Sequence, residues 1–234
     1  RPYPDILAGA GYHVGYTGKG WGPGNWKFAG RAHNPAGVEY NEIKNQTPSS
    51  QINPIDYASN FEAFLRARPS GVPFCFWYGG IDPHRVYEAG SGLANGKRLD
   101  EIDVPPFFPD ARLVRSDIAD YALHIDWFDK HLGRMIAALE ARGELDNTLI
   151  VVTSDNGMPF PRCKATLYDW GTHMPLAVRW GAKVKPGREV DDFVSFIDFA
   201  PTFLEAAGVP VPAVMEGESL MPLLTSEKSG TIDP

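Results

Sequence analysis

Two stretches of the chain place apolar residues three or four positions apart, which is the spacing of one helix face. The first is 57–67 (YASNFEAFLRA), and the second runs from Leu113 to Gly143. In the second stretch the apolar positions are Ile118, Tyr121, Ile125, Phe128, Leu132, Ile136 and Leu139. The spacing predicts two amphipathic helices, the longer of which ends at Gly143 as a C-cap residue.

Shorter apolar runs predict buried strands. They are 73–81 (PFCFWYGGI), 148–156 (TLIVVTSDN), 175–180 (PLAVRW) and 193–197 (FVSFI). The 148–156 run is apolar on both faces, as a central parallel strand needs. After the last run, Asp198 is expected to cap a helix that stops at Gly208. Helices that alternate with apolar strands predict an α/β fold.

Glycine and proline gather in two regions of the chain. There are 24 Gly and 21 Pro, and many of them lie in 18–54 and 79–109. Both regions are too long for plain connections in a compact domain, so we expect long ordered loops. Such loops usually carry function. No internal repeat and no clear domain boundary precede the tail that begins at Val209.

The charge of the chain limits its partners. Lys and Arg total 22 and Asp and Glu total 29, which gives a net charge of −7. This excludes a general attraction to nucleic acid or acidic membranes, so a polyanionic substrate must meet a local basic site. No stretch approaches the roughly 20 apolar residues of a membrane helix. Cys75 and Cys163 lie far apart and form neither a C-x-x-C motif nor a disulfide framework.

Asp155 and Asn156 stand at the end of the predicted 148–156 strand, with no separate turn between them and its apolar residues. In open α/β sheets, ligands bind at the carboxyl ends of strands. Hard cations such as Ca²⁺ and Mg²⁺ take carboxylate and amide oxygens, and Gly157 lets the loop bend. The alternative is that SDNG is only a turn, because Asp, Asn and Gly are the residues that turns prefer.

Several motifs, taken together, resemble the sulfatase family in their order and spacing. They are GYHVGYTGKG (11–20), DPHR (82–85), TLIVVTSDNG (148–157), K-x-x-LY (164–168), IDFAPTFLEAAGVPVP (197–212) and EGESLMPLL (216–224). The resemblance covers nearly the whole chain. DNGMPFPRCKATLY together with DPHR is most similar to the heparan N-sulfatase branch of the family.

The resemblance implies an alkaline-phosphatase-like α/β fold, with a mostly parallel sheet and helices on both faces. It also implies hydrolysis of a sulfate ester or sulfamate with a formylglycine beside one Ca²⁺. By the same resemblance Asp155 and Asn156 are calcium ligands, Lys19 and Lys164 bind the sulfate oxygens, and His84 contacts the leaving atom. These roles suit the chemistry, because fixed cations stabilise charge on the sulfate oxygens and His can supply a proton near neutral pH.

The implied substrate is a sulfated carbohydrate, with neither nucleic acid nor membrane as a partner, and the oligomeric state is left open. By resemblance, residues 1–208 belong to the catalytic domain and 209–234 begin the connection to a C-terminal subdomain. Family members are mostly periplasmic, secreted or lysosomal, which gives the expected location.

Single residues also have plainer interpretations. A lone Lys is usually a solvated surface charge, and a lone His is more often structural. Arg85 is either a second cation for the substrate or the partner of a surface acid. Trp21, Trp26 and Phe28 either form a stacking wall for a sugar ring or anchor a long loop. We interpret four further residues as structural: His124, His131, Arg162 and His173.

Two departures from the family pattern bear on activity. The nucleophile motif C-x-P-S-R and its Ser variant are absent, as are the paired aspartates that precede it, so neither Cys75 nor Cys163 is expected to be the formylglycine precursor. We therefore expect the chain to be the downstream part of a larger enzyme and to be inactive alone. In GKGWGPG, Trp21 stands where relatives have a His, and His33 is a candidate substitute.

Two other function classes stay open. A phosphodiesterase or phosphomutase relative on the same fold would need a metal pair with several His ligands, but the chain has no D-x-x-x-H cluster at its strand ends. A non-catalytic homologue that only binds sulfated glycans is favoured by Trp21 and disfavoured by the five residues that the resemblance places in the site, Lys19, His84, Asp155, Asn156 and Lys164.

Overall fold

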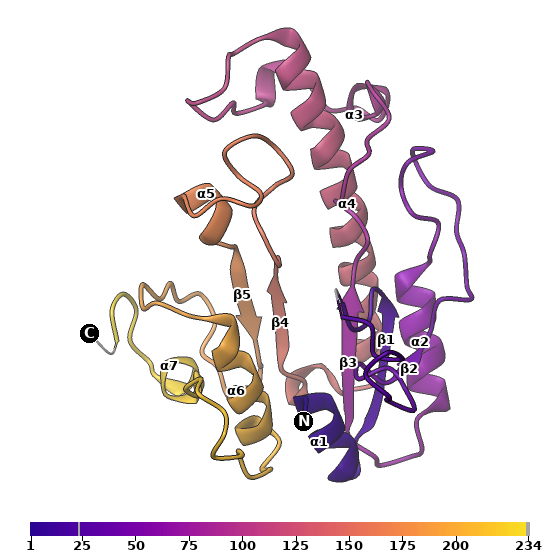
Figure 1. The fold of residues 1–234 in the computed structure, drawn as a ribbon, viewed down its shortest axis with the longest axis vertical. Coiled ribbons are helices and arrows are strands. Elements are labelled where there is room, and N and C mark those ends of the chain that lie inside the picture. The colour runs from indigo at the N-terminus through magenta and orange to yellow at the C-terminus, as the bar shows by residue number, and fades with distance from the viewer. Residues whose placement is uncertain (23, 233–234) are drawn as a thin grey trace. The chain divides into compact units, whose positions relative to one another are not determined.

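The computed structural model describes residues 1–22 and 24–232, which form two compact units. Unit 2 is His13–Ala137, and unit 1 combines Arg1–Tyr12 with the chain from Ala138 onward. Figure 1 shows their helices and strands in chain order by colour. Among the described residues, none of the helices has the length and apolar character needed to cross a membrane.

Unit 2 is built on a parallel sheet with the strand order β2-β1-β3. The strands are β1 (His13–Gly18), β2 (Val38–Glu39) and β3 (Phe74–Gly79). β1 and β3 pair along their whole length, from His13 opposite Phe74 to Gly18 opposite Gly79. The predicted strand in 73–81 is confirmed, and so is the expectation of parallel pairing for this sheet.

Helix α2 (Tyr57–Ala67) has the bounds that its apolar spacing predicts. Asp56 caps it, because its carboxylate accepts a hydrogen bond from the Ser59 amide at 2.9 Å. The helix packs on the sheet through aromatic contacts, since the ring of Phe64 lies 4.6 Å from that of Phe76. Gly15 in β1 allows this approach, because a Cβ there would lie 2.8 Å from the Phe64 ring.

Helix α4 (Arg112–Ala141) is the long helix predicted for 113–143. It ends in a Schellman motif: the Glu144 amide donates to the Leu139 carbonyl at 3.0 Å, and the Gly143 amide donates to the Glu140 carbonyl at 2.9 Å. Gly143 has a φ of 67°, which explains the glycine. The predicted C-cap is confirmed.

Among the described residues, the regular structure in the long loops of unit 2 consists of short elements. These are β2, the helix α3 (Ser91–Ala94), the 3-10 helix η1 (Leu99–Glu101) and a bridge between Lys44 and Ile55. The loop between β3 and α4 therefore carries little regular structure of its own, so its shape depends on contacts with other elements.

Unit 1 contains a two-stranded sheet and several short helices. The strands are β4 (Ile150–Thr153) and β5 (Leu176–Arg179), and the helical elements are α1 (Tyr3–Gly9), η2 (Leu145–Asn147), α5 (Asp169–Thr172), η3 (Phe196–Asp198), α6 (Phe199–Ala206) and α7 (Met221–Thr225). α1 and α6 contact each other through Tyr3 and Phe203, whose ring centres lie 5.1 Å apart.

Two predictions for unit 1 need correction. β4 lies where a strand was predicted, but in the described residues it pairs antiparallel with β5, not with a parallel neighbour. An apolar run indicates burial and cannot give the direction of the partner strand. Residues 193–197 form no strand, because Ser195 and Asp198 make a capping box that starts the 3-10 helix η3.

Helix α6 (Phe199–Ala206) has the predicted position, but Asp198 does not cap it as predicted. α6 begins directly after Asp198, but the Asp198 carboxylate accepts from the Ser195 amide at 2.8 Å and the Glu218 amide at 3.0 Å, not from α6. The helix ends before Gly208, whose φ of 68° allows the turn. The predicted bounds of the helix are therefore right, and the bonding of its cap is different.

Candidate active site

Lys19 follows β1 at the edge where the carboxyl ends of the parallel strands meet. Its backbone amide donates a hydrogen bond to the carbonyl of Gly79, the last residue of β3, at 2.6 Å. The Lys19 side chain is exposed and makes no ion pair within residues 1–22 and 24–232. Its ammonium group is therefore a free cation at the edge of the sheet, available to an anion.

Two hydrogen bonds between the Asn41 side chain and the backbone of Gly18 hold the turn that carries Lys19. The Asn41 side chain accepts from the Gly18 amide at 2.7 Å and donates to the Gly18 carbonyl at 3.1 Å. Gly18 has a φ of 77°, and a Cβ there would lie 2.0 Å from the Gly79 carbonyl oxygen. Sequence reasoning missed Asn41, whose only signal is an amide directly after a short strand.

His84 lies in the loop after β3, at the same edge of the sheet. Its Nδ1 atom is 2.6 Å from the carbonyl oxygen of Arg85. Because a carbonyl only accepts hydrogen bonds, Nδ1 carries the proton, and Nε2 is the ring atom left for a ligand. The side chain is exposed, so Nε2 can meet a leaving atom.

Arg85 shows the second of its two predicted alternatives. Its guanidinium makes a two-point ion pair with Asp117 of α4, at 3.0 and 2.6 Å, and lies over the Tyr87 ring at 4.7 Å. The Asp117 carboxylate raises the pKa of Arg85 further above its usual range. A charge compensated in this way is less available to a substrate than that of Lys19, and a role in substrate binding stays a prediction.

In unit 1, Asp155 and Asn156 lie in the loop directly after β4. The Asn156 amide nitrogen donates to the Gly157 carbonyl at 2.9 Å, which leaves the side-chain oxygen as its free end. The Asp155 carboxylate is exposed and makes no hydrogen bond or ion pair with the described parts of the chain. Both residues therefore present oxygen atoms without partners.

This donor set fits part of a calcium site. Ca²⁺ prefers carboxylate and amide oxygens but takes about six to eight of them. Within the described ranges, no group of three or more His, Cys, Asp or Glu side chains is placed to bind a metal ion. Asp155 and Asn156 can thus supply some ligands of a hard cation, and the others must come from elsewhere.

Lys164 lies farther along the same loop of unit 1. Its backbone amide donates to the Met158 carbonyl at 3.1 Å, and its side chain is exposed without an ion pair in the part of the chain that the structure describes. A Cβ on Gly157 would lie 2.0 Å from the Trp170 carbonyl oxygen, so the loop folds back closely on itself there. Two residues interpreted as structural lie in the same region: Arg162 has a φ of 65°, and His173 Nδ1 lies 3.2 Å from an Asp169 carboxylate oxygen.

Both cysteines are free thiols in the structure. Burial raises the pKa of Cys75 to about 12 and also raises the pKa of Cys163. Neither thiol has the lowered pKa of a reactive cysteine. That neither cysteine is the nucleophile precursor stays a prediction.

The two helix histidines are buried. His124 pairs with Asp82, with 2.7 Å between Nδ1 and a carboxylate oxygen, and His131 accepts from the Ala58 amide at 3.3 Å. Burial lowers the pKa of His131 to about 4, so it is neutral at neutral pH. The interpretation of both as structural fits these contacts. His124 also holds the first residue of the DPHR segment, Asp82, which lies two residues before His84.

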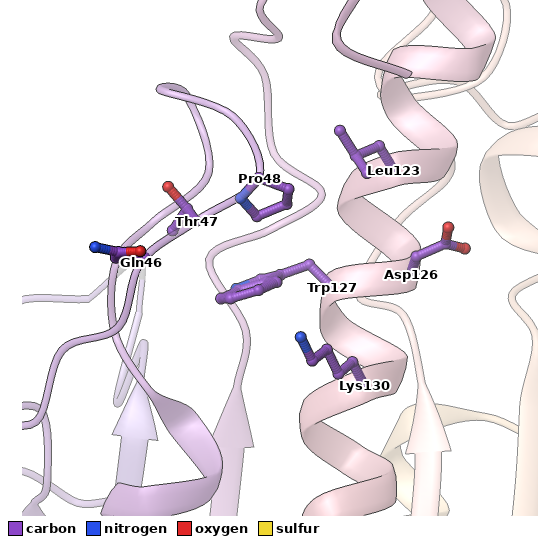
Figure 2. A pocket seen from close by; sticks show the side chains of 7 residues that line it. All are labelled: Gln46, Thr47, Pro48, Leu123, Asp126, Trp127 and Lys130. Carbon is purple, nitrogen blue, oxygen red and sulfur yellow. The ribbon is translucent and has the colours of Figure 1, made fainter. Parts of the chain in front are cut away.

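A cavity of about 360 Å³ lies in unit 2 between the 46–48 loop and α4. Figure 2 shows Trp127 extending from α4 toward Pro48, with Lys130 beside it. The Lys130 ammonium lies 5.3 Å from the centre of the Trp127 ring. No candidate site residue lines this cavity, so the candidate site is an edge of the sheet and not this hollow.

The family assignment comes from comparison with known proteins. The model of the sulfatase family matches residues 3–209. The chain belongs to the sulfatase family. The resemblance noted in the sequence is thereby confirmed.

Relatives of this sulfatase-family chain are much longer than it. It is 30% identical over 186 residues to the human N-sulphoglucosamine sulphohydrolase, covering 66% of this chain and 37% of the relative. It is 40% identical over 112 residues to an N-acetylglucosamine-6-O-sulfatase of Bacteroides thetaiotaomicron, covering 46% and 20%. The chain therefore matches only a minor part of the length of either relative.

A solved structure supports the fold. It is that of a protein in complex with its substrate D-glucosamine-2-N,6-O-disulfate, with a TM-score of 0.68 and 23% identity, and the match covers 98% of this chain and 65% of that one. The predicted alkaline-phosphatase-like α/β fold is confirmed. At this identity the likeness concerns the fold alone.

Proposed function

We propose that the chain is part of a hydrolase that removes sulfate, as an ester or a sulfamate, from a sulfated sugar. The observation that carries the proposal is that Lys19 and His84 follow the carboxyl ends of two neighbouring parallel strands, β1 and β3. Lys19 offers a free cation, and His84 offers its Nε2 atom. A cation and a proton donor at one edge of a sheet are what the cleavage of a sulfate group needs.

Each residue has a distinct role in this proposal. Lys19 and Lys164 bind the peripheral sulfate oxygens and stabilise the charge that stays on them. His84, with both ring nitrogens protonated, donates the proton on Nε2 to the leaving oxygen or nitrogen and keeps the one on Nδ1. Arg85 keeps the segment in place through Asp117 and adds positive charge near the substrate.

A calcium ion and a formylglycine complete the proposed enzyme. Asp155 and Asn156 would bind the ion through their free oxygens, and the ion would supply positive charge to the sulfate. The formylglycine would supply the nucleophile and would come from a residue outside these 234. We also propose that the complete protein is periplasmic, secreted or lysosomal, that residues 1–208 belong to its catalytic domain, and that 209–234 begin the connection to a further subdomain.

Sulfated glucosamine is the substrate class that we favour. The two relatives described above are named for N-sulfated glucosamine and for the 6-O-sulfate of N-acetylglucosamine. The neighbouring structure contains a glucosamine with an N-sulfate and a 6-O-sulfate. A non-catalytic glycan-binding homologue is the second candidate. Trp21 favours it, because this side chain is 48% exposed and replaces a proton acceptor of the relatives.

The test uses the full-length protein that contains this chain. Release of inorganic sulfate is measured from N-sulfoglucosamine and from glucosamine 6-sulfate, before and after removal and return of Ca²⁺. We expect Lys19→Met and Lys164→Met each to lower kcat/KM by about 100-fold or more, because each removes a cation from the developing charge. Lys44→Met and Lys185→Met should change it less than about twofold. These exposed lysines of units 2 and 1 make no side-chain hydrogen bond or ion pair among the described residues, so only surface charge is removed.

The possible outcomes separate the two candidate functions. Sulfate release that depends on both lysines and on Ca²⁺ supports the hydrolase. Binding of sulfated glucosamine without any release would instead support the binding homologue. Release that is equal in the site and control variants would place the reaction away from Lys19 and Lys164.

A further inference from the structure

We propose that His124 is a positioning residue that sets the place of His84 through Asp82. The inference rests on the proposed function, in which His84 donates the proton to the leaving group. It concerns a buried side chain on α4, away from the exposed residues that would meet the substrate.

The contact between His124 and Asp82 is buried on both sides. His124 Nδ1 lies 2.7 Å from an Asp82 carboxylate oxygen, and the two residues are 0% and 4% exposed. Because the ionised carboxylate only accepts, His124 donates this hydrogen bond. A hydrogen bond to a charged group in a dry interior is strong and costly to lose. Asp82 is therefore fixed at a point two residues before His84.

The residues around Asp82 are fixed as well. The second Asp82 oxygen accepts from the Asn53 amide at 3.2 Å. The Ile81 amide donates to the Tyr57 hydroxyl at 3.2 Å, and the Tyr87 hydroxyl donates to the Pro83 carbonyl at 2.7 Å. Residues 81, 82 and 83 are thus each held by hydrogen bonds, with Tyr57 of α2, with His124 and Asn53, and with Tyr87 of the same loop, respectively.

One face of α4 carries several side chains that hold the segment from Tyr78 to Gly92. Asp117, Asp120, His124 and Phe128 lie three or four residues apart, so they share that face. Asp117 pairs with Arg85, Asp120 accepts from the amides of Gly90 and Gly92 at 2.9 and 2.7 Å, and Phe128 stacks on Tyr78 with ring centres 4.6 Å apart. The segment from Tyr78 to Gly92 is therefore fastened to the helix at several points. Asp117 holds Arg85, one residue after His84, and His124 holds Asp82, two residues before it.

This placement matters because the His84 ring has little support of its own. Its side chain hydrogen-bonds to the neighbouring Arg85 carbonyl. Its position relative to a substrate is set by the backbone of the 82–85 segment. A proton donor must lie within about 3.2 Å of the leaving atom, and a displacement of about 1 Å can reduce the rate by about 100-fold.

Two nearly isosteric variants separate the hydrogen bond from the packing. His124→Asn keeps an N–H donor at the place of Nδ1, and His124→Leu has almost the same shape as Asn without the donor. In the full-length protein we expect His124→Leu to lower kcat on a sugar sulfate by about 30-fold, with KM changed less than about threefold. We expect His124→Asn to stay within about threefold of the wild-type kcat, because the donor is kept.

The leaving group identifies the step that is affected. An aryl sulfate with an acidic phenol leaves without a proton, so it should lose less than about threefold in His124→Leu and in His84→Gln. In the double variant, His124→Leu should add no further loss to His84→Gln, because residues that act through one another are not additive. Equal losses with both kinds of leaving group, or losses that multiply, would show that His124 contributes only to folding and would overturn the inference.

Hydrogen exchange tests the positioning separately from the proposed function. We expect amides in 81–87 to exchange about tenfold faster in His124→Leu than in His124→Asn, and those in β1 to be unchanged. If the wild type releases no sulfate from any substrate, the proposed function fails and the inference about His84 catalysis falls with it. If sulfate is released and exchange in 81–87 is the same in both variants, the inference alone is wrong.

Discussion

The two loops that carry the candidate residues are stabilised in different ways. The 80–92 loop of unit 2 is fastened to α4 and α2 by side chains far away in sequence, including the buried Asp82–His124 pair and Asp120. The 154–172 loop of unit 1 is stabilised by contacts within itself, such as Asn156 to Gly157 and Lys164 to Met158. One loop is held by hydrogen bonds from buried side chains far away in sequence. The hydrogen bonds described for the other are local, and it also buries Phe160 and Cys163.

This difference suits the proposed roles. A proton donor needs an exact position, and long-range buried contacts provide one for His84. A ligand of a hard cation needs free oxygen atoms, and a locally bonded loop leaves those of Asp155 and Asn156 without partners. Exposed apolar side chains in the second loop fit this description, since Leu167 is 95% exposed and Tyr168 is 70% exposed. A bound ion would stabilise the folded conformation of this loop.

Removing one acid that supports each loop should give the largest contrast. Asp120→Ala should lower the free energy of unfolding by about 4 kcal/mol, because two backbone amides lose a charged acceptor in a buried place. Asp169→Ala should cost less than about 0.5 kcal/mol, since its pair with His173 is exposed. Urea unfolding of the full-length variants measures both. Equal costs would mean that the contacts with α4 do not stabilise the 80–92 loop.

Acid should lower the stability of the folded state through His131, a buried residue of α4. The folded-state pKa of about 4 lies below the unfolded value of 6.5, because burial disfavours the charged ring. The unfolded state therefore binds more protons between these values, and the stability present above pH 6.5 is lost as pH falls toward 4. For this single group the loss is about 3 kcal/mol.

Variant His131→Asn checks the source of this pH dependence. It keeps an acceptor for the Ala58 amide but has no titrating group. Its free energy of unfolding should fall less steeply between pH 6.5 and 4 than that of the wild type. The same slope in both proteins would contradict the assignment to His131. Part of the remaining slope should belong to Asp56, whose hydrogen bonds from Ser59 and Arg134 lower its pKa against the opposing effect of burial.

Native-state hydrogen exchange compares the two loops without any mutation. The Gly92 amide, bonded to the buried Asp120, should exchange at least about 100-fold more slowly than the amides of 155–157. Mass spectrometry of the full-length protein without Ca²⁺ gives both rates. Addition of Ca²⁺ should slow only the second set, because the ion would bind there. Fast exchange at Gly92 would remove the distinction between the loops.

The sequence predicts the local elements of this molecule well. The bounds of α2 follow from apolar spacing alone, and Gly143 marks the end of α4 through its left-handed backbone. These features depend on neighbours in sequence. The antiparallel partner of β4 and the absent strand at 193–197 depend on contacts that an apolar run does not specify.

The candidate site is predictable in part for the same reason. The sequence motifs identify His84 and Lys19. The orientation of the His84 ring, which leaves Nε2 free, depends on a hydrogen bond to its sequence neighbour Arg85. Asp117 and Asp120 were missed, because their partners in the 85–92 segment lie far from them in sequence. A usable signal was present in the acids and His124, which lie at helical spacing on a face that also carries apolar residues.

A structure of the full-length protein soaked with Ca²⁺ and inorganic sulfate tests the central claim most directly. The account predicts anomalous density for one cation bound by the oxygens of Asp155 and Asn156. It also predicts a sulfate ion that contacts the ammonium groups of Lys19 and Lys164 and the Nε2 atom of His84. A cation bound elsewhere, or a sulfate that contacts none of these three side chains, would contradict it.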